Sequence, residues 1–98
     1  MIAYTRRALR QVAQLIRHYD ERERYEAIRG FRAALDEAES RIAHSPAEGL
    51  HAPRPYPALR QPGRAWVKAG RYWIAYRTSK PPMIVAVFFE TADIPTRL

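Results

Sequence analysis

Residues 64–89 constrain the fold more than any other stretch, because they contain three consecutive strand-like segments separated by two turn signals. Gly70 separates the first segment from the second, and residues 79–82, Ser-Lys-Pro-Pro, separate the second from the third. The third segment, residues 83–89, is apolar on both faces, which is typical of an interior strand covered by other elements. The rest of the chain must therefore supply the cover.

Side chains alternate between the two faces of a strand, so each segment predicts which residues share a face. In residues 72–76, one face is expected to carry Tyr72, Ile74 and Tyr76, and the other Trp73 and Ala75. In residues 83–89, the same alternation places Met83, Val85, Val87 and Phe89 against Ile84, Ala86 and Phe88.

Two amphipathic helices are expected before this sheet, after a short strand candidate at residues 2–5. Thr5 can cap the first helix, which should end near residue 19. Asp20 and Glu23 have the spacing of a capping box, which predicts the start of the second helix. The expected apolar stripe of the first helix is Leu9, Val12, Leu15, Ile16 and Tyr19, and that of the second is Ile28, Phe31, Leu35, Ala38 and Ile42.

The connection between helices and sheet, residues 45–63, contains five prolines and two glycines, which excludes a helix or a central strand there. It is expected to lie along the surface, with Tyr56 or Leu59 anchored in the core. Because neither half can bury its apolar face alone, residues 1–98 are expected to form one domain. The predicted fold is α+β: an antiparallel β-sheet with an N-terminal helical hairpin packed on one face, in the order β-α-α-β-β-β.

The formal charge of +7 is distributed unevenly along the chain. Residues 45–98 carry six Arg and two Lys against three acidic residues, a net +5, so the sheet half is the basic half. A basic patch favours an acidic protein partner or a nucleic acid. The alternative is that the positive charge serves solubility and reflects an arginine-rich coding bias, because 15 of the 17 basic residues are Arg.

Several classes of function are disfavoured by composition. The chain has no cysteine, which excludes disulfides and thiolate metal sites and agrees with a reducing cytoplasm. Early arginines interrupt any signal-peptide-like apolar run, and no window is long enough for a transmembrane helix, so no membrane partner is expected. His18, His44 and His51 lack the spacing of metal ligands, and no phosphate-binding glycine loop is present, so neither metal nor cofactor is expected.

Several segments together resemble a known protein family. They are Tyr-Thr-Arg-Arg-Ala-Leu at residues 4–9, Gly-Arg-Tyr-Trp-Ile-Ala-Tyr-Arg at 70–77, the apolar strand at 84–88, and Asp93-Ile94 with Leu98 at the end. Together with the proline-rich connection and the order of elements, they resemble the RelE/ParE superfamily of type II toxin–antitoxin toxins, and more closely its ParE branch. The resemblance covers nearly the whole chain and rests on order and spacing.

The resemblance implies a cytoplasmic, non-catalytic toxin that inhibits DNA gyrase. It also implies a toxin–antitoxin hetero-oligomer, in which an acidic, partly disordered, ParD-like antitoxin folds on the toxin and neutralises it. The expected docking surface is the groove between the helical hairpin and the sheet. Candidate contacts to antitoxin or target are Arg10, Arg17, Lys68, Arg71, Trp73 and Arg77.

Two alternatives remain open. The first is a RelE-like, ribosome-dependent messenger RNA endoribonuclease built around Lys68, Arg71 and Arg77, whose chemistry needs a base, an acid and cations around the scissile phosphate. Lys68 matches a basic strand position of such enzymes, but Trp73 stands where an arginine is usual, and no His or Tyr follows Tyr76. The second is a non-toxic binding module. A further reading gives these residues no role in function: Arg71 and Arg77 are then solvated strand ends, and Trp73 is a packing residue.

Overall fold

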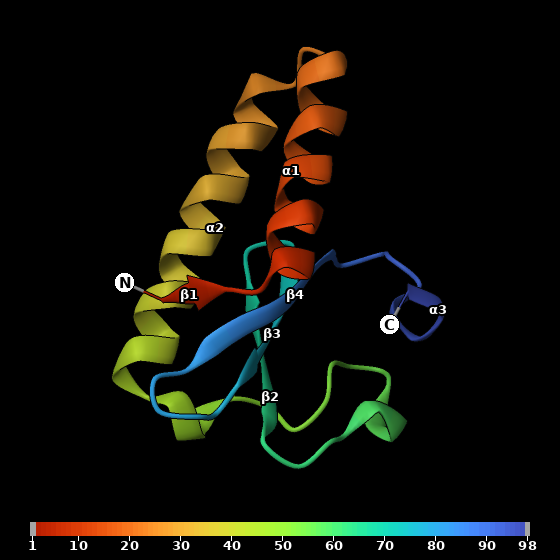
Figure 1. Ribbon diagram of the computed structural model, residues 1–98. Helices are drawn as coiled ribbons and strands as arrows, with labels where there is room; N and C mark the ends of the chain where they lie inside the picture. The colour runs from red at the N-terminus through yellow and green to blue at the C-terminus, as the bar shows by residue number, and fades with distance from the viewer. Residues whose placement is uncertain (1, 98) are drawn as a thin grey trace.

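The computed structural model describes residues 2–97 and has an α+β fold, as predicted. The two long helices stand side by side as a hairpin against the sheet and extend beyond one end of it (Figure 1). No helix in the described part of the chain is long and apolar enough to span a bilayer. Leu98, part of the family resemblance, lies outside the described residues. The elements in chain order are β1 (Ala3–Tyr4), α1 (Arg6–Glu21), α2 (Tyr25–His44), η1 (Pro46–Glu48), η2 (Pro57–Leu59), β2 (Arg64–Ala69), β3 (Tyr72–Arg77), β4 (Met83–Phe89) and α3 (Ile94–Arg97).

The four strands form a mixed sheet in the order β1-β4-β3-β2. Strands β2, β3 and β4 are antiparallel neighbours, as predicted, whereas the two-residue β1 joins β4 in parallel. Strand β4 therefore lies in the interior of the sheet, in agreement with its apolar character on both faces. The turn between β2 and β3 depends on Gly70, whose φ of +55° is unfavourable for residues with a side chain.

A β-bulge in β4 corrects the predicted alternation of its side chains. Ala75 pairs with Ala86 and Tyr76 with Ile84, so Val85 is an extra residue opposite no partner. As a result, Ile84 faces the helices together with Val87, while Val85 and Ala86 both contribute to the opposite core. The predicted set that joined Val85 to Val87 is wrong, because a strict two-residue period does not survive an inserted residue. The predicted faces of β3 are confirmed.

The connection between α1 and α2 also differs from the prediction. Thr5 caps α1 by accepting a hydrogen bond from the backbone N–H of Ala8, as predicted. The expected capping box is wrong: Asp20 lies inside α1, and α2 begins after Arg24 without a side-chain cap. Glu23 instead has a φ of +54°, its N–H donates to Asp20 O, and Arg24 N–H donates to Tyr19 O. This is a Schellman motif that ends α1 and reverses the chain.

The helical hairpin covers one face of the sheet with a common apolar core. In α2 the expected stripe is confirmed, with Phe31, Ala38 and Ile42 fully buried. In α1 the stripe is shifted by one position at its start: Ala8 is buried, whereas Leu9 is 54% exposed, contrary to the prediction. Ala8, which has no accessible surface, therefore takes the inward position at the start of α1.

The opposite face of the sheet is covered by the proline-rich segment and by the residues after β4. Tyr56 and Leu59 both pack on this second core, which confirms their predicted role as anchors. Its buried members are Trp66, Trp73, Ala75, Val85, Ala86, Phe88 and Ile94. Both faces of the sheet are therefore covered, the first by helices and the second mostly by irregular chain.

Candidate functional site

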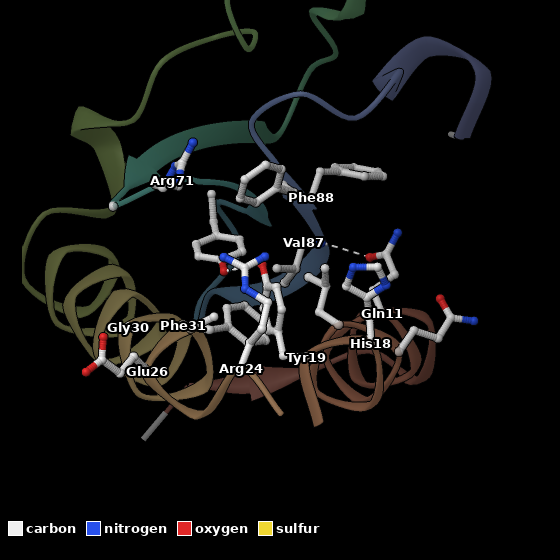
Figure 2. Close-up of a pocket in the computed structure, with 16 residues that line it drawn as sticks. Gln11, His18, Tyr19, Arg24, Glu26, Gly30, Phe31, Arg71, Val87 and Phe88 are labelled. Carbon is white, nitrogen blue, oxygen red and sulfur yellow. Dashed lines mark hydrogen bonds between the residues drawn. The ribbon is translucent and has the colours of Figure 1, made fainter. Parts of the chain in front are cut away.

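A groove opens where the helical hairpin extends past the end of the sheet. It has a volume of about 920 Å³ and lies between the facing sides of α1 and α2, the β2–β3 turn and the end of β4 (Figure 2). Its volume is near the upper end of the range typical of ligand pockets. A smaller hollow of about 320 Å³ lies at the end of α2, where Arg41 already donates to Lys68 O and His44 bonds to Ser40 O. The larger groove is therefore the candidate site.

The floor of the groove is aromatic. Phe31 packs on Tyr72 with ring centroids 4.6 Å apart, and the rings of Phe89 and Tyr72 meet edge to face with centroids 5.5 Å apart. The hydroxyls of Tyr19 and Tyr72 form a hydrogen bond of 2.7 Å within this floor. Burial, followed by this bond to Tyr19, raises the pKa of Tyr72 well above its ordinary value. The hydroxyl of Tyr72 is thus neutral at physiological pH.

Cations border this aromatic floor. The guanidinium of Arg24 lies over the ring of Tyr19 at 5.5 Å, and that of Arg71 lies over the ring of Phe89 at 5.2 Å. In the described part of the chain, no carboxylate pairs with Arg24. Glu26 is the acidic residue in the lining, and its side chain is 94% exposed and pairs with Arg29 at 3.7 Å. The groove therefore combines an apolar floor with a net positive rim.

Glu90 binds both Arg71 and Lys68 beside the groove. It accepts a hydrogen bond of 2.6 Å from Arg71 Nε and one of 3.3 Å from Lys68 Nζ. The bond from Arg71 is the main cause that lowers the pKa of Glu90 below its ordinary value, and Lys68 adds to the effect. Glu90 thus holds Arg71 at the mouth of the groove and compensates part of the local positive charge.

The structure brings three of the six predicted site residues together and leaves three apart. Lys68, Arg71 and Trp73 form one cluster, in which Lys68 Nζ lies 5.7 Å from the Trp73 ring. Trp73 is only 4% exposed and belongs to the second core, so it packs inside the molecule.

Of the remaining three, Arg10 and Arg17 are exposed on α1 and do not line the groove. Arg77 lies at the far end of β3, about 20 Å from Arg71 if each residue of a strand advances about 3.3 Å. Arg71 is therefore the one predicted contact that lines the groove.

Sequence reasoning missed Arg24, Glu90 and the tyrosine hydroxyl pair. Glu90 could not be assigned from the sequence, because it lies opposite Arg71 only through the register shift at Val85; unbroken pairing from Arg77 and Met83 would place Phe89 there. No local pattern identifies Arg24, whose place depends on how the Schellman motif turns the chain.

Gln11 is a further residue that the sequence did not single out. Its side-chain oxygen accepts a hydrogen bond of 2.8 Å from the backbone N–H of Val87. This N–H points away from β3, at the edge of β4 beyond the two residues that pair with the short β1. Gln11 therefore satisfies the open edge of β4 and forms one wall of the groove (Figure 2).

In the described residues, no group of three or more His, Asp or Glu side chains is arranged to hold a metal ion. The chain matches no protein-family model, and a search of curated proteins found no significant match. Arguments about function therefore depend on the groove, its charges and the order of the elements.

Proposed function

We propose that this chain is the toxin of a type II toxin–antitoxin pair, similar to the ParE branch, and that it acts by binding DNA gyrase. The observation that carries the proposal is the groove between the helical hairpin and the sheet, with its aromatic floor and cationic rim. An amphipathic acidic segment of an antitoxin would bury its apolar side chains on this floor and direct its carboxylates to the arginines.

The charge of the chain supports an acidic partner. The net charge of +7 would speed the encounter with an acidic protein, and Arg24 has no carboxylate partner among the described residues. Aromatic residues and arginines are the residue types that most often dominate binding energy at protein interfaces. The proposed docking surface contains both, and a hetero-oligomer of toxin and antitoxin follows from it.

The endoribonuclease alternative has weaker support. Its proposed basic set was Lys68, Arg71 and Arg77, yet Glu90 binds the first two, and Arg77 lies about 20 Å away by strand geometry. Transfer of the 2′-hydroxyl proton and stabilisation of the phosphorane require the groups to converge within hydrogen-bond reach of one phosphate. We therefore favour a target-binding toxin over an RNA-cutting enzyme.

The test begins with expression of the chain in bacteria, with and without the short acidic protein expected from the neighbouring reading frame. Growth arrest that the acidic protein relieves is the expected result, and absence of any growth defect would favour the non-toxic binding module. Purified protein is then added to a gyrase supercoiling assay and to a cell-free translation assay. Inhibited supercoiling with intact messenger RNA supports the proposal, whereas cleaved messenger RNA with unaffected gyrase contradicts it.

A further inference from the structure

We propose that the groove contains a carboxylate-binding subsite, formed by the guanidinium of Arg24 and the paired hydroxyls of Tyr19 and Tyr72. Its ligand is the side chain of one Glu or Asp of the partner. That the partner is an antitoxin rests on the function proposed above, but the subsite is argued from the geometry of this chain alone.

The two hydroxyls leave one hydrogen available for a ligand. Tyr19 and Tyr72 together have two O–H donors, and the 2.7 Å bond between them uses one. Both residues are only 5% exposed, and no other hydrogen bond of these hydroxyls occurs in the described part of the chain. Buried hydroxyls normally have their donors satisfied. An acceptor arriving through the groove would satisfy the remaining O–H.

Arg24 supplies the charge that makes an anion the preferred acceptor. Its side chain extends from the start of α2 across the groove beside Tyr19, and its guanidinium lies 5.5 Å from the centre of that ring (Figure 2). The pKa of Tyr72 is raised by burial and by its bond to Tyr19, and the positive charges of Arg71 and Arg24 oppose that rise. The positive charges of both arginines therefore act on the Tyr72 hydroxyl.

The neighbouring charges favour an anion from outside the chain. Arg71 is held by Glu90 through a bond of 2.6 Å, so its charge is largely compensated, whereas Arg24 has no such partner among the described residues. Glu26 turns outward to Arg29. A carboxylate can accept from a guanidinium and a hydroxyl at once, and such charge-assisted bonds are roughly twice as strong as neutral ones.

Propionate, which is a glutamate side chain without its backbone, tests the subsite directly in the free protein. It is titrated at low ionic strength against the isotope-labelled chain, with propionamide as the neutral isostere, and the Arg Nε–H and Tyr ring signals are followed by NMR. We expect saturable shifts at Arg24, Tyr19 and Tyr72 with propionate and none with propionamide. Shifts of equal size at Arg24 and at the exposed Arg29, or an equal response to propionamide, would overturn the proposal.

Two variants and one matched control complete the test. Arg24→Gln should weaken propionate binding severalfold, because the charge-assisted bond from an exposed guanidinium is lost. The double variant Tyr19→Phe, Tyr72→Phe keeps both rings but removes both hydroxyls, and it should also weaken binding. Arg29→Gln, on the same helix but outside the groove lining, should bind as the wild type does. Wild-type affinity in Arg24→Gln and in the double tyrosine variant would contradict the subsite.

The outcome is separable from that of the proposed function, because no antitoxin is present in the titration. Localised propionate binding in a chain that is not toxic supports the subsite and contradicts the toxin assignment. Gyrase inhibition by a chain that shows no localised propionate binding supports the proposed function and contradicts the subsite.

Discussion

Glu90 is the residue on which the charges beside the groove depend. It follows β4 directly and accepts hydrogen bonds from both Arg71 and Lys68. The bond from Arg71 lowers the pKa of Glu90 in the folded chain, so the unfolded chain binds its proton more readily. A depressed carboxyl pKa adds stability above the unfolded value and loses it as pH falls through the folded value. The cluster is therefore expected to weaken in acid.

Replacing this carboxylate tests that linkage. Below about pH 4.5, the ordinary pKa of this carboxyl, the unfolding free energy of Glu90→Gln should fall less steeply with pH than that of the wild type. The reason is that no carboxylate remains at this position to be protonated. Urea midpoints measured between neutral pH and about pH 3 give the slope. Glu48→Gln, at an exposed position on η1, is the control and should keep the wild-type slope. A slope in Glu90→Gln identical to that of the wild type would show that the cluster does not titrate as described.

Arg71 and Arg77 begin and end the same strand region but differ in their relation to the groove. Arg71 lines it, whereas Arg77 lies at the opposite end of β3. Arg71→Glu should weaken binding of the proposed acidic antitoxin by about tenfold or more, equivalent to roughly 1.4 kcal/mol, while Arg77→Glu leaves it nearly unchanged. Calorimetric titration measures both. Both side chains are exposed, so folding should change little, and equal losses of affinity would argue against the groove as the docking surface.

Phe31 is the residue of α2 that connects the core to the floor of the groove. It is fully buried and packs on Tyr72 at 4.6 Å. Phe31→Ala should cost about 3–5 kcal/mol of unfolding free energy, because it leaves a cavity under the tyrosine pair. Leu9→Ala on α1 is the control: Leu9 is 54% exposed, so the change should stay within about 0.5 kcal/mol. Chemical denaturation measures both values, and similar costs would mean that the helix faces are assigned wrongly.

At the scale of elements, the join between α1 and β4 is what keeps the hairpin on the sheet. Because β1 pairs with only the first two residues of β4, the following part of that edge depends on α1 for cover. Thr5 begins this contact through its N–H, which donates to Ile84 O at 2.9 Å, and Gln11 continues it at Val87. The wall of the groove is therefore also a structural joint.

Removing the side chain of Gln11 tests this joint. Gln11→Ala should cost about 1–3 kcal/mol, because the part-buried N–H of Val87 loses its acceptor. The amide hydrogen of Val87 should also exchange with solvent faster than its neighbours in β4. Gln14→Ala, which removes an exposed side chain on the same helix, should leave both quantities unchanged. Unchanged exchange at Val87 in Gln11→Ala would mean that the hydrogen bond is not maintained in solution.

The elements were predictable where local patterns suffice. Alternation identified the faces of β3, and the helical period identified the stripe of α2 around Phe31. The bulge at Val85 was not predictable. Because every residue of this segment is apolar, a shift by one residue leaves the hydrophobic pattern unchanged. The Schellman motif was missed because Glu23 occupies a position that usually holds Gly, so no glycine marked the end of α1.

At the scale of the whole molecule, the candidate site arises from long-range packing. The groove joins α1 and α2 to the β2–β3 turn and the end of β4, and these segments lie far apart in the sequence. The sequence predicted a groove between hairpin and sheet and one of its cations, Arg71. It could not predict that Arg24 and the tyrosine pair converge there, because their meeting depends on the length by which the hairpin extends past the sheet (Figure 1).

NMR mapping of the proposed acidic antitoxin on the labelled chain is the most direct test of the central proposal, that the groove is the surface by which such a partner would bind and neutralise this protein. Large shift changes are expected around Arg24, Tyr72 and Phe89, with little change at Tyr56 and Leu59 on the opposite face of the sheet. Changes confined to Tyr56, Leu59 and their surroundings, with an unaltered groove, would contradict the claim.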